Sequence, residues 1–354
     1  MSSVFHARSN RYAVNNLRGL ARYSTLLVFL VAIAASITLL TALSFGSVAI
    51  SINQSIAVLS QAIFSSDPLS TVEYTIVIDI RLPQLIMAFI TGSGLAMAGV
   101  VLQTITRNPL ADPYLFGISS GSALGAVIVL ALLPAAAISL SVGALIGGLL
   151  AVVLMLSLAG KNMARVESLV LSGVAVSFML SSVTGIILYY SSPETTANLI
   201  FWLMGSISNI SWSELTLPVL TLIACFIIFV IFQRWLSALQ TGDESAHALG
   251  VPVKALRIIM LVTCSLITAV IVAKVGGIGF VGLMIPHISR FLVGAQFIRL
   301  LMMSSVLGGL FMMWVHVIAQ SALTDQILPV GIVTSAIGSI FFFIILKSRG
   351  NQVV

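Results

Sequence analysis

The residues that could do chemistry in this 354-residue chain are few, and they form no catalytic constellation. His316 lies inside an apolar stretch, and His287 lies beside a proline. Ionisable groups within a membrane are costly to bury, so either histidine could be a ligand or a proton relay. A lone histidine is more often a hydrogen-bonded packing residue, and that interpretation stays open. All ten acidic residues lie at segment ends or in loops, which argues against coupling to an ion gradient.

Nucleotide and metal motifs are equally sparse. Residues 277–282 match the dinucleotide pattern GxGxxG, but no strand–helix–strand unit surrounds them and no acid follows about 20 residues later. Their glycines more plausibly allow a tight return into the membrane. Cys225 and Cys264 lie in apolar runs, which predicts buried packing residues. We therefore expect this chain to bind no cofactor or metal and to be no enzyme, so that any energy for work comes from elsewhere.

Apolar segments must position these residues. The chain is 59% hydrophobic and 7% charged, whereas a soluble domain is roughly 45–50% apolar and about 25% charged. A membrane-spanning helix needs about 20 apolar residues, and the chain supplies about ten such stretches with short connections. We predict an all-α integral membrane protein with a single transmembrane domain over residues 24–346, flanked by tails 1–23 and 347–354.

The order of the segments follows from breaks in hydropathy. The predicted spans are 24–44, 82–104, 114–133, 137–159, 166–190, 214–233, 257–274, 278–294, 300–320 and 330–346. A weakly apolar external stretch, 45–81, precedes the second span, which opens at Leu82-Pro83 because proline is tolerated near a helix start. Residues 194–210 are expected to form a short external helix or a surface-lying segment.

Charge fixes the orientation. With the N-terminus inside, fourteen of the sixteen Lys and Arg residues fall on one side, and only Arg81 and Lys274 fall on the other. The positive-inside rule assigns the basic side, and with it both tails, to the cytoplasm. If 278–294 were re-entrant, the tally would fall to ten against six, so a full crossing is favoured. The basic residues face lipid headgroups, and no nucleic acid partner is expected.

Small residues recur at helical spacing within the spans. Rows include Ala88, Gly92 and Ala96 in the second span, Gly121 and Gly125 in the third, and Gly143 and Gly147 in the fourth. Such rows let helix backbones approach closely, because lipid provides no hydrophobic drive between helices. They predict a tightly packed bundle and say nothing about substrate.

Two internal connections are more polar than a bundle requires. Residues 107–113 hold two prolines, and Asn108 and Asp112 can cap the backbone that follows them. Residues 236–256 place Asp243-Glu244 at a helix start and Gly250-Val251-Pro252 at a stop, which predicts a short helix on the cytoplasmic face. The first connection could be an ordinary turn and the second a plain linker or a docking surface for a partner.

Several blocks together resemble the FecCD-type permease family, the membrane subunits of type II ATP-binding-cassette (ABC) importers. The similarity covers roughly residues 80–348. The blocks are Arg81-Leu82-Pro83 with Leu102-Gln103, Arg107-Asn108-Pro109-Leu110-Ala111-Asp112-Pro113 with Gly117-Ile118-Ser119-Ser120-Gly121, Gly242-Asp243-Glu244-Ser245-Ala246 with Leu249-Gly250-Val251, Gly279-Phe280-Val281-Gly282-Leu283 with Pro286-His287 and Arg290, and Leu328-Pro329-Val330-Gly331 with Thr334.

The resemblance implies a type II ABC importer permease fold and a function. It implies transport of an iron chelate, most readily a ferric siderophore and next haem or cobalamin, across a bacterial inner membrane into the cytoplasm. The implied partners are two ATPase subunits that bind ATP and Mg, a second permease subunit (identical or a paralogue), and a periplasmic or lipoprotein substrate-binding protein. The alternatives from other classes are an ion-coupled secondary transporter, an anchoring membrane protein and an intramembrane enzyme.

The resemblance also implies site residues. The ATPase-coupling surface within 236–256 comprises Gly242, Asp243, Glu244, Ser245, Ala246, Leu249 and Gly250. The cytoplasmic gate comprises Asn108, Pro109 and Leu110, and the binding-protein dock comprises Arg81, Gln84 and Gln320. The family often has Arg where Gln84 stands and sometimes a basic residue near Gln320, so we expect a weaker, less salt-sensitive dock or a more basic partner permease. A bulky cargo favours a path of small and weakly polar residues, for which we name Gln103, Ser119, Ser120, Pro286 and His287.

Overall fold

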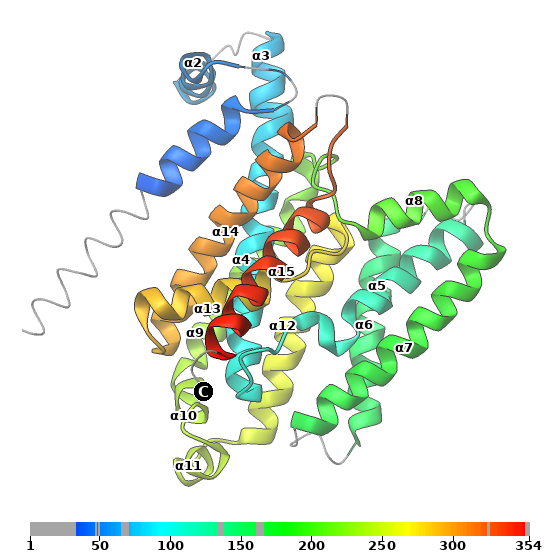
Figure 1. Ribbon diagram of the computed structural model, residues 1–354, viewed down its shortest axis with the longest axis vertical. Helices are drawn as coiled ribbons and strands as arrows, with labels where there is room; N and C mark the ends of the chain where they lie inside the picture. The colour runs from blue at the N-terminus through cyan, green and yellow to red at the C-terminus, as the bar shows by residue number, and fades with distance from the viewer. Residues whose placement is uncertain are drawn as a thin grey trace, which may run out of the picture.

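The computed structural model of this chain is a bundle of helices (Figure 1). It describes residues 33–46, 48, 50–64, 71–133, 138–160, 166–323 and 326–350, and no strand occurs within these ranges. The predicted tail 1–23 and the start of the first predicted span lie outside the described residues. The same holds for Asp67, Lys161, Arg165 and Asp325.

The elements follow one another with short connections. They are the helix Ile33–Ser44, α2 (Ile52–Phe64), α3 (Val72–Tyr74), the π-helix η1 (Thr75–Arg81), α4 (Leu82–Thr106), the 3-10 helix η2 (Pro113–Phe116), α5 (Ile118–Val127), the π-helix η3 (Ile128–Leu132), α6 (Leu140–Ala159), α7 (Val166–Tyr190), α8 (Pro193–Leu203), the 3-10 helix η5 (Trp212–Glu214), α9 (Thr216–Ile231), α10 (Gln233–Leu239), α11 (Asp243–Ala248), α12 (Val253–Val275), α13 (Val281–Val293), α14 (Phe297–Ser321) and α15 (Val330–Gly350).

Apolar helices occupy every predicted span. Six stretches within the described residues are long and apolar enough to cross a membrane: Val72–Thr106, Leu140–Ala159, Val166–Tyr190, Trp212–Ile231, Val253–Val275 and Phe297–Ser321. The shorter apolar helices Ile33–Ser44, Ile118–Leu132, Val281–Val293 and Val330–Ile345 fall on the remaining predicted spans. The predicted all-α membrane fold is confirmed.

Helix α4 is the core of the bundle. Of the 18 most apolar consecutive residues within Val72–Thr106, 89% are buried, whereas the corresponding share in α7 is 28%. Helices α14, α12 and α13 all pack against it, and Figure 1 shows it running through the middle of the molecule. A helix that is apolar on all sides is expected to be enclosed by others. Most buried polar side chains of α4 accordingly have partners inside the bundle, among them Gln84, Ser93 and Gln103.

α4 begins at Leu82, where we predicted it, but helical structure extends further toward the N-terminus than we predicted. We expected residues 45–81 to be an external stretch and the helix to open at Leu82-Pro83, but helical structure begins at Val72. Pro83 has no N–H to donate, and proline inside a helix normally kinks or ends it. The π-helix η1 lies directly before Pro83, where the N–H of Leu82 donates to the carbonyl of Val77. Such a widened turn absorbs an irregularity without breaking the helix.

Helix α13 is shorter than the predicted span 278–294 and lies across α4. Its 13 residues extend roughly 20 Å, less than the roughly 30 Å of a hydrocarbon core. The carbonyl of Gly282 near its start and the guanidinium of Arg290 near its end both hydrogen-bond the side chain of Gln103. Both ends of α13 therefore lie near Gln103 of α4, which means that α13 crosses α4 instead of running along it. Arg290 nevertheless lies near Arg107, on the side that the charge tally predicted.

Glycine pairs hold the helices at backbone contact. A Cβ added to Gly92 would overlap the carbonyl oxygen of Gly308 in α14, and a Cβ on Gly99 would overlap that of Gly282 in α13. The predicted rows in α5 and α6 meet in the same way, with Gly121 against Gly147 and Gly125 against Gly143. The rows of small residues therefore make the close contacts expected of them.

Replacing Gly92 with alanine tests this contact. We expect Gly92→Ala to lower the free energy of unfolding by about 1–3 kcal/mol, because the new methyl group meets backbone that cannot rotate away. The matched control is Gly185→Ala in α7, where an added Cβ has no atom within 4 Å and the change should be neutral or slightly stabilising. The measurement is thermal unfolding of the purified protein in detergent. Equal melting temperatures for the two variants would contradict the packing argument.

Candidate functional site

The short helix α11 lies exposed at one end of the bundle, which we call the α11 end (Figure 1). Gly242 before it has φ 120° and Gly250 after it has φ 81°, conformations that favour glycine. Within α11, the side chain of Ala246 is fully buried and that of Glu244 is exposed; Leu249, directly after the helix, is also exposed. The short surface helix predicted over this stretch is present.

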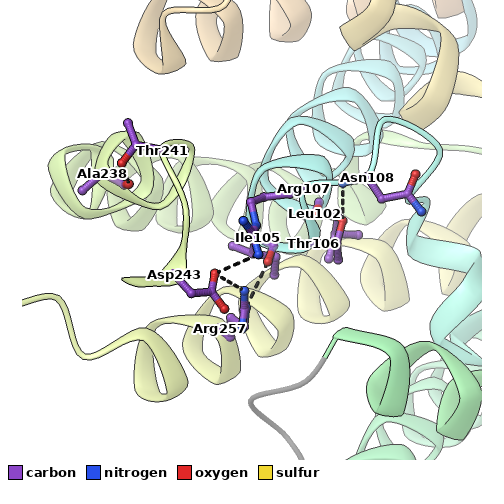
Figure 2. A network of polar contacts seen from close by, with 9 residues as sticks. All are labelled: Leu102, Ile105, Thr106, Arg107, Asn108, Ala238, Thr241, Asp243 and Arg257. Carbon is purple, nitrogen blue, oxygen red and sulfur yellow. Dashed lines mark hydrogen bonds and ion pairs between the residues drawn. The ribbon is translucent and has the colours of Figure 1, made fainter. Parts of the chain in front are cut away.

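A buried arginine ties α11 to the core helix. Asp243 Oδ1 lies 2.8 Å from Arg257 Nη2, and Arg257 Nε donates to the carbonyl of Ile105 at 3.0 Å. Arg107 Nη2 reaches the same carboxylate oxygen at 3.4 Å. Figure 2 shows Asp243 between the two arginines, beside the last turn of α4. Arg257 is only 1% exposed, so its charge depends on these partners.

The loop that follows α4 carries the predicted gate residues. Arg107 ends the helix in the left-handed conformation, with φ 50°. Asn108 Oδ1 accepts from the N–H of Leu110 at 2.9 Å, the cap that its residue type predicted. Asn108, Pro109 and Leu110 are all exposed. The gate residues therefore follow directly on the arginine that contacts Asp243.

Asp112, in the same loop, is buried. Its carboxylate accepts from the N–H of Tyr114 at 2.8 Å and caps η2, as predicted. The hydroxyl of Tyr114 in turn accepts from the N–H of Ile278 at 2.8 Å. Burial raises the pKa of Asp112 to about 6, and the N–H of Tyr114 partly opposes that rise.

A cavity of about 340 Å³ opens at the α11 end between the loop after α4 and the end of α13. Its lining residues are Gln103, Thr104, Arg107, Pro109, Gln240 and Arg290. Gln103, which we expected on the translocation path, is 4% exposed and lies at the inner wall of this cavity. Its amide donates to the carbonyl of Gly282 at 3.1 Å and accepts from Arg290 at 3.3 Å. Pro286 is likewise buried inside the bundle.

A second hollow of about 500 Å³ lies beside α11. It is lined by His247, Pro252, Val253, Lys254, Ala255 and Ile258. Leu249, which is 72% exposed, lies close by in sequence. Exposed apolar surface next to a hollow is typical of a binding site for another protein.

The predicted dock residues lie at the opposite end of the bundle, where Arg81 and Gln84 are buried and Gln320 is half-buried; their contact with a binding protein stays a prediction. Arg81 is 5% exposed, and its guanidinium donates to the carbonyl of Leu43 at 2.6 Å and to that of Val48. It therefore ties the turn after Ile33–Ser44 to the core helix and presents little charge to a partner.

The structure brings together Gln84, which is buried, and Gln320, which is half-buried. Gln84 Oε1 accepts from Gln320 Nε2 at 2.9 Å and lies 3.3 Å from His316 Nε2. Gln84 Nε2 donates to the carbonyl of Ser208 at 2.5 Å. His316 is 1% exposed and acts here as the hydrogen-bonded packing residue that we considered.

The remaining predicted path residues lie in two different parts of the bundle. Ser119 and Ser120 are half-buried at the start of α5, and Ser120 Oγ accepts from Ser181 Oγ of α7 at 3.2 Å. We did not predict Ser181 or its exposed neighbour Ser182; small residues recurring on the exposed face of α7 were the available signal. His287 lies elsewhere, with its ring 5.1 Å from that of Phe291 in the same helix. Within the described residues, no group of three or more His, Cys, Asp or Glu side chains could hold a metal ion.

Comparisons with known proteins agree on one family. A family model described as the FecCD transport family matches residues 31–348. The chain is 36% identical over 276 residues to a Helicobacter pylori protein described as an iron chelatin transport system permease protein, covering 78% of this chain and 83% of that one. It is 36% identical over 271 residues to the cobalamin import system permease protein BtuC of Halobacterium salinarum, covering 76% and 73%. A solved structure described as an inward-facing conformation of a metal-chelate type ABC transporter matches with TM-score 0.80 at 29% identity, covering 91% of this chain and 99% of that one.

Removing the charge of Asp243 should destabilise the α11 end. Asp243→Asn removes the carboxylate that lies 2.8 Å from the buried Arg257, and we expect a loss of roughly 1–3 kcal/mol in the free energy of unfolding. This is below the full value for a buried pair because Asp243 is 38% exposed. Glu244→Gln is the matched control, since Glu244 makes no ion pair within the described residues. Thermal unfolding measures the difference; equal stability of the two variants would contradict this role of Asp243.

Asp112 should make stability depend on pH. Its folded pKa of about 6 lies above the ordinary value of 3.8, so the folded state holds the proton more tightly and stability falls as pH rises from about 4 through 6. Asp112→Asn keeps the acceptor for Tyr114 and cannot ionise. We expect this variant to melt higher than the natural protein above pH 7 and to converge with it near pH 4. Asp79→Asn, which removes an exposed carboxylate, controls for the loss of a charge. A difference in melting temperature between Asp112→Asn and the natural protein that stays the same at all pH values would contradict the prediction.

Proposed function

Because this chain belongs to the FecCD transport family, we propose that it is the permease subunit of an ABC importer that carries an iron chelate into the cytoplasm. A ferric siderophore is our first candidate for the cargo, and haem or cobalamin is the second. Two separate ATPase subunits would hydrolyse ATP with Mg. A second permease subunit and a periplasmic or lipoprotein binding protein would complete the complex. This multi-pass membrane protein would lie in a bacterial inner membrane with both ends in the cytoplasm.

The observation that carries this proposal is the link from α11 to the core helix. Asp243 is the first residue of an exposed helix, and Arg257 joins its carboxylate to the carbonyl of Ile105 in the last turn of α4. Asn108, the first of the predicted gate residues, lies three residues after Ile105. A force applied to α11 by a neighbouring subunit would therefore reach the end of α4 through two short polar contacts. This geometry supports a role for α11 as the surface on which the ATPase acts.

The two acidic residues of α11 would have different tasks. Asp243 is engaged within the chain, whereas Glu244 is exposed and makes no ion pair within the described residues. Leu249 and the hollow beside α11 add apolar surface close to Glu244. We infer that Glu244 and Leu249 contact the ATPase, while Asp243 passes the displacement on to the bundle.

A wide path of weakly polar residues would suit a bulky cargo. Helix α7 exposes Ser181 and Ser182, and Ser181 hydrogen-bonds Ser120 of α5. Only 28% of the most apolar 18-residue stretch of α7 is buried in this chain. The helix therefore has a long exposed face that could line a path between this subunit and a second permease subunit. Short hydroxyl side chains would let a chelate pass without holding it. Cargo selection would then lie in the binding protein.

One observation favours a second candidate, a proton-coupled carrier. Such a carrier needs a carboxylate that can exchange a proton inside the bundle, and Asp112 is a buried carboxylate whose pKa is raised to about 6. Its place in a loop, and the family of the chain, favour the importer. The source of energy separates the two functions.

The test is uptake by the full complex in sealed proteoliposomes. We expect uptake to require ATP and the binding protein and to survive collapse of the proton and sodium gradients. Glu244→Lys should lower uptake on the order of tenfold, the factor that corresponds to about 1.4 kcal/mol of lost docking energy. Ser237→Lys, at an exposed position of α10 near α11, is the matched control and should leave uptake unchanged.

Two results would count against the proposal. Uptake that stops when the gradients collapse and ignores ATP would identify a carrier. Glu244→Lys uptake equal to that of Ser237→Lys, with both proteins folded, would remove α11 from the contact with the ATPase.

A further inference from the structure

The cavity of about 340 Å³ at the α11 end is lined by two arginines, and none of the described residues that line it is acidic. Arg107 comes from the loop after α4, and Arg290 comes from the last turn of α13. Gln103, Gln240 and Thr104 add polar groups to the same wall. The cavity is therefore a basic, polar recess beside the loop that follows α4.

The charges around this cavity do not balance. Asp243 is the carboxylate within ion-pair distance of Arg257, at 2.8 Å, and of Arg107, at 3.4 Å. Arg290 is half-buried, its hydrogen bond goes to the neutral amide of Gln103, and it has no carboxylate at ion-pair distance within the described residues. Of the two arginines that line the cavity, Arg107 thus shares its carboxylate with Arg257, and Arg290 has no ion pair within the described residues. Partly buried positive charge without a counter-charge is unfavourable and attracts an anion.

The size and the donor types narrow the class of anion. A water molecule occupies about 30 Å³ of liquid, so the cavity holds roughly ten such volumes and is too roomy for a single halide ion. Arginine forks match the oxygens of phosphate with two parallel hydrogen bonds. We propose that this cavity binds a phosphate group, presented either by an anionic phospholipid or as free inorganic phosphate.

Both sources fit the surroundings of the cavity. Phe291, directly after Arg290, is 78% exposed, and Leu110, directly after Pro109, is 55% exposed. These apolar side chains next to a basic recess suit a phospholipid, whose headgroup and acyl chains are joined. Free phosphate would use the arginines alone. The chemistry recognised is the same in the two cases.

Occupancy of the cavity would bear on the link to α11. The Arg107–Asp243 contact is the longer of the two ion pairs and the more exposed, with side chains 49% and 38% accessible, so it is weak. A phosphate at the cavity would compete with Asp243 for Arg107 and would leave the shorter Arg257–Asp243 pair in place. The gate loop would then be held by the bound anion instead of by α11.

The experiment measures thermal stability of the full-length chain in lipid nanodiscs. One arm adds inorganic phosphate to nanodiscs of phosphatidylcholine, against potassium chloride at equal ionic strength. The other arm replaces part of the phosphatidylcholine with phosphatidylglycerol and omits phosphate. We expect at least one arm to raise the melting temperature by roughly 2–4 °C, because a ligand that binds only the folded state stabilises it. The four tryptophans provide the fluorescence signal.

Matched variants locate the effect. Arg290→Gln keeps a hydrogen-bonding side chain and loses the charge, and it should abolish the gain. Arg107→Gln, on the exposed loop, should do the same and covers the case in which Arg290→Gln does not fold. Arg234→Gln removes an exposed charge of α10 that does not line the cavity, and it should keep the full gain.

The outcomes separate the sources. A gain with phosphate alone identifies free phosphate, and a gain with phosphatidylglycerol alone identifies the lipid headgroup. No gain in either arm, or a gain in the Arg290→Gln and Arg107→Gln variants equal to that of the natural protein, would overturn the proposal.

Discussion

Lipid gives helices no hydrophobic reason to associate, and the rest of this structure depends on how the chain meets that constraint. It does so with glycines that bring backbones into contact, above all Gly92 against Gly308 and Gly99 against Gly282. These contacts place α4 at the centre, with α14 and α13 against it. Close backbone contact also leaves no room for water. Gln84, Ser93 and Gln103 of α4 therefore bond to groups of the bundle, whereas the buried hydroxyl of Thr91 has no hydrogen-bond partner within the described residues.

Charge follows from the same constraint. The described basic residues gather at the α11 end, and Arg81 and Lys274 at the opposite end each have partners: two carbonyls for Arg81 and Glu214 for Lys274. Arg257 is the most deeply buried of the described arginines, and it is held by Asp243 and by a backbone carbonyl. Its burial turns an ordinary surface helix into one that is mechanically joined to the core. The motif that identifies the family thus has a physical meaning in this chain.

The opposite end shows how far residue type can mislead about exposure. Arg81, Gln84 and Gln320, the residues of the predicted dock, all make hydrogen bonds within the chain. Gln84 links α4, α14 and the carbonyl of Ser208 at once. A neutral amide serves this purpose well, because it donates and accepts in the same place. The departure from the family's usual arginine is therefore compatible with a structural task at this position.

The sequence by itself determined the apolar helices, the grouping of charge, the caps at Asn108 and Asp112, and the family, which the comparisons confirm. These features depend on segment length, composition and the chemistry of neighbouring residues, all of which are local. Only the tertiary structure decided the burial of Arg81 and Asp112, the crossing of α13 over α4, and the Ser120–Ser181 contact. Each of these rests on groups far apart in the chain, as between Gln103 and Arg290, 187 residues apart. No periodicity within a single segment encodes which distant backbone will lie against it, so such contacts become visible only once the helices are packed.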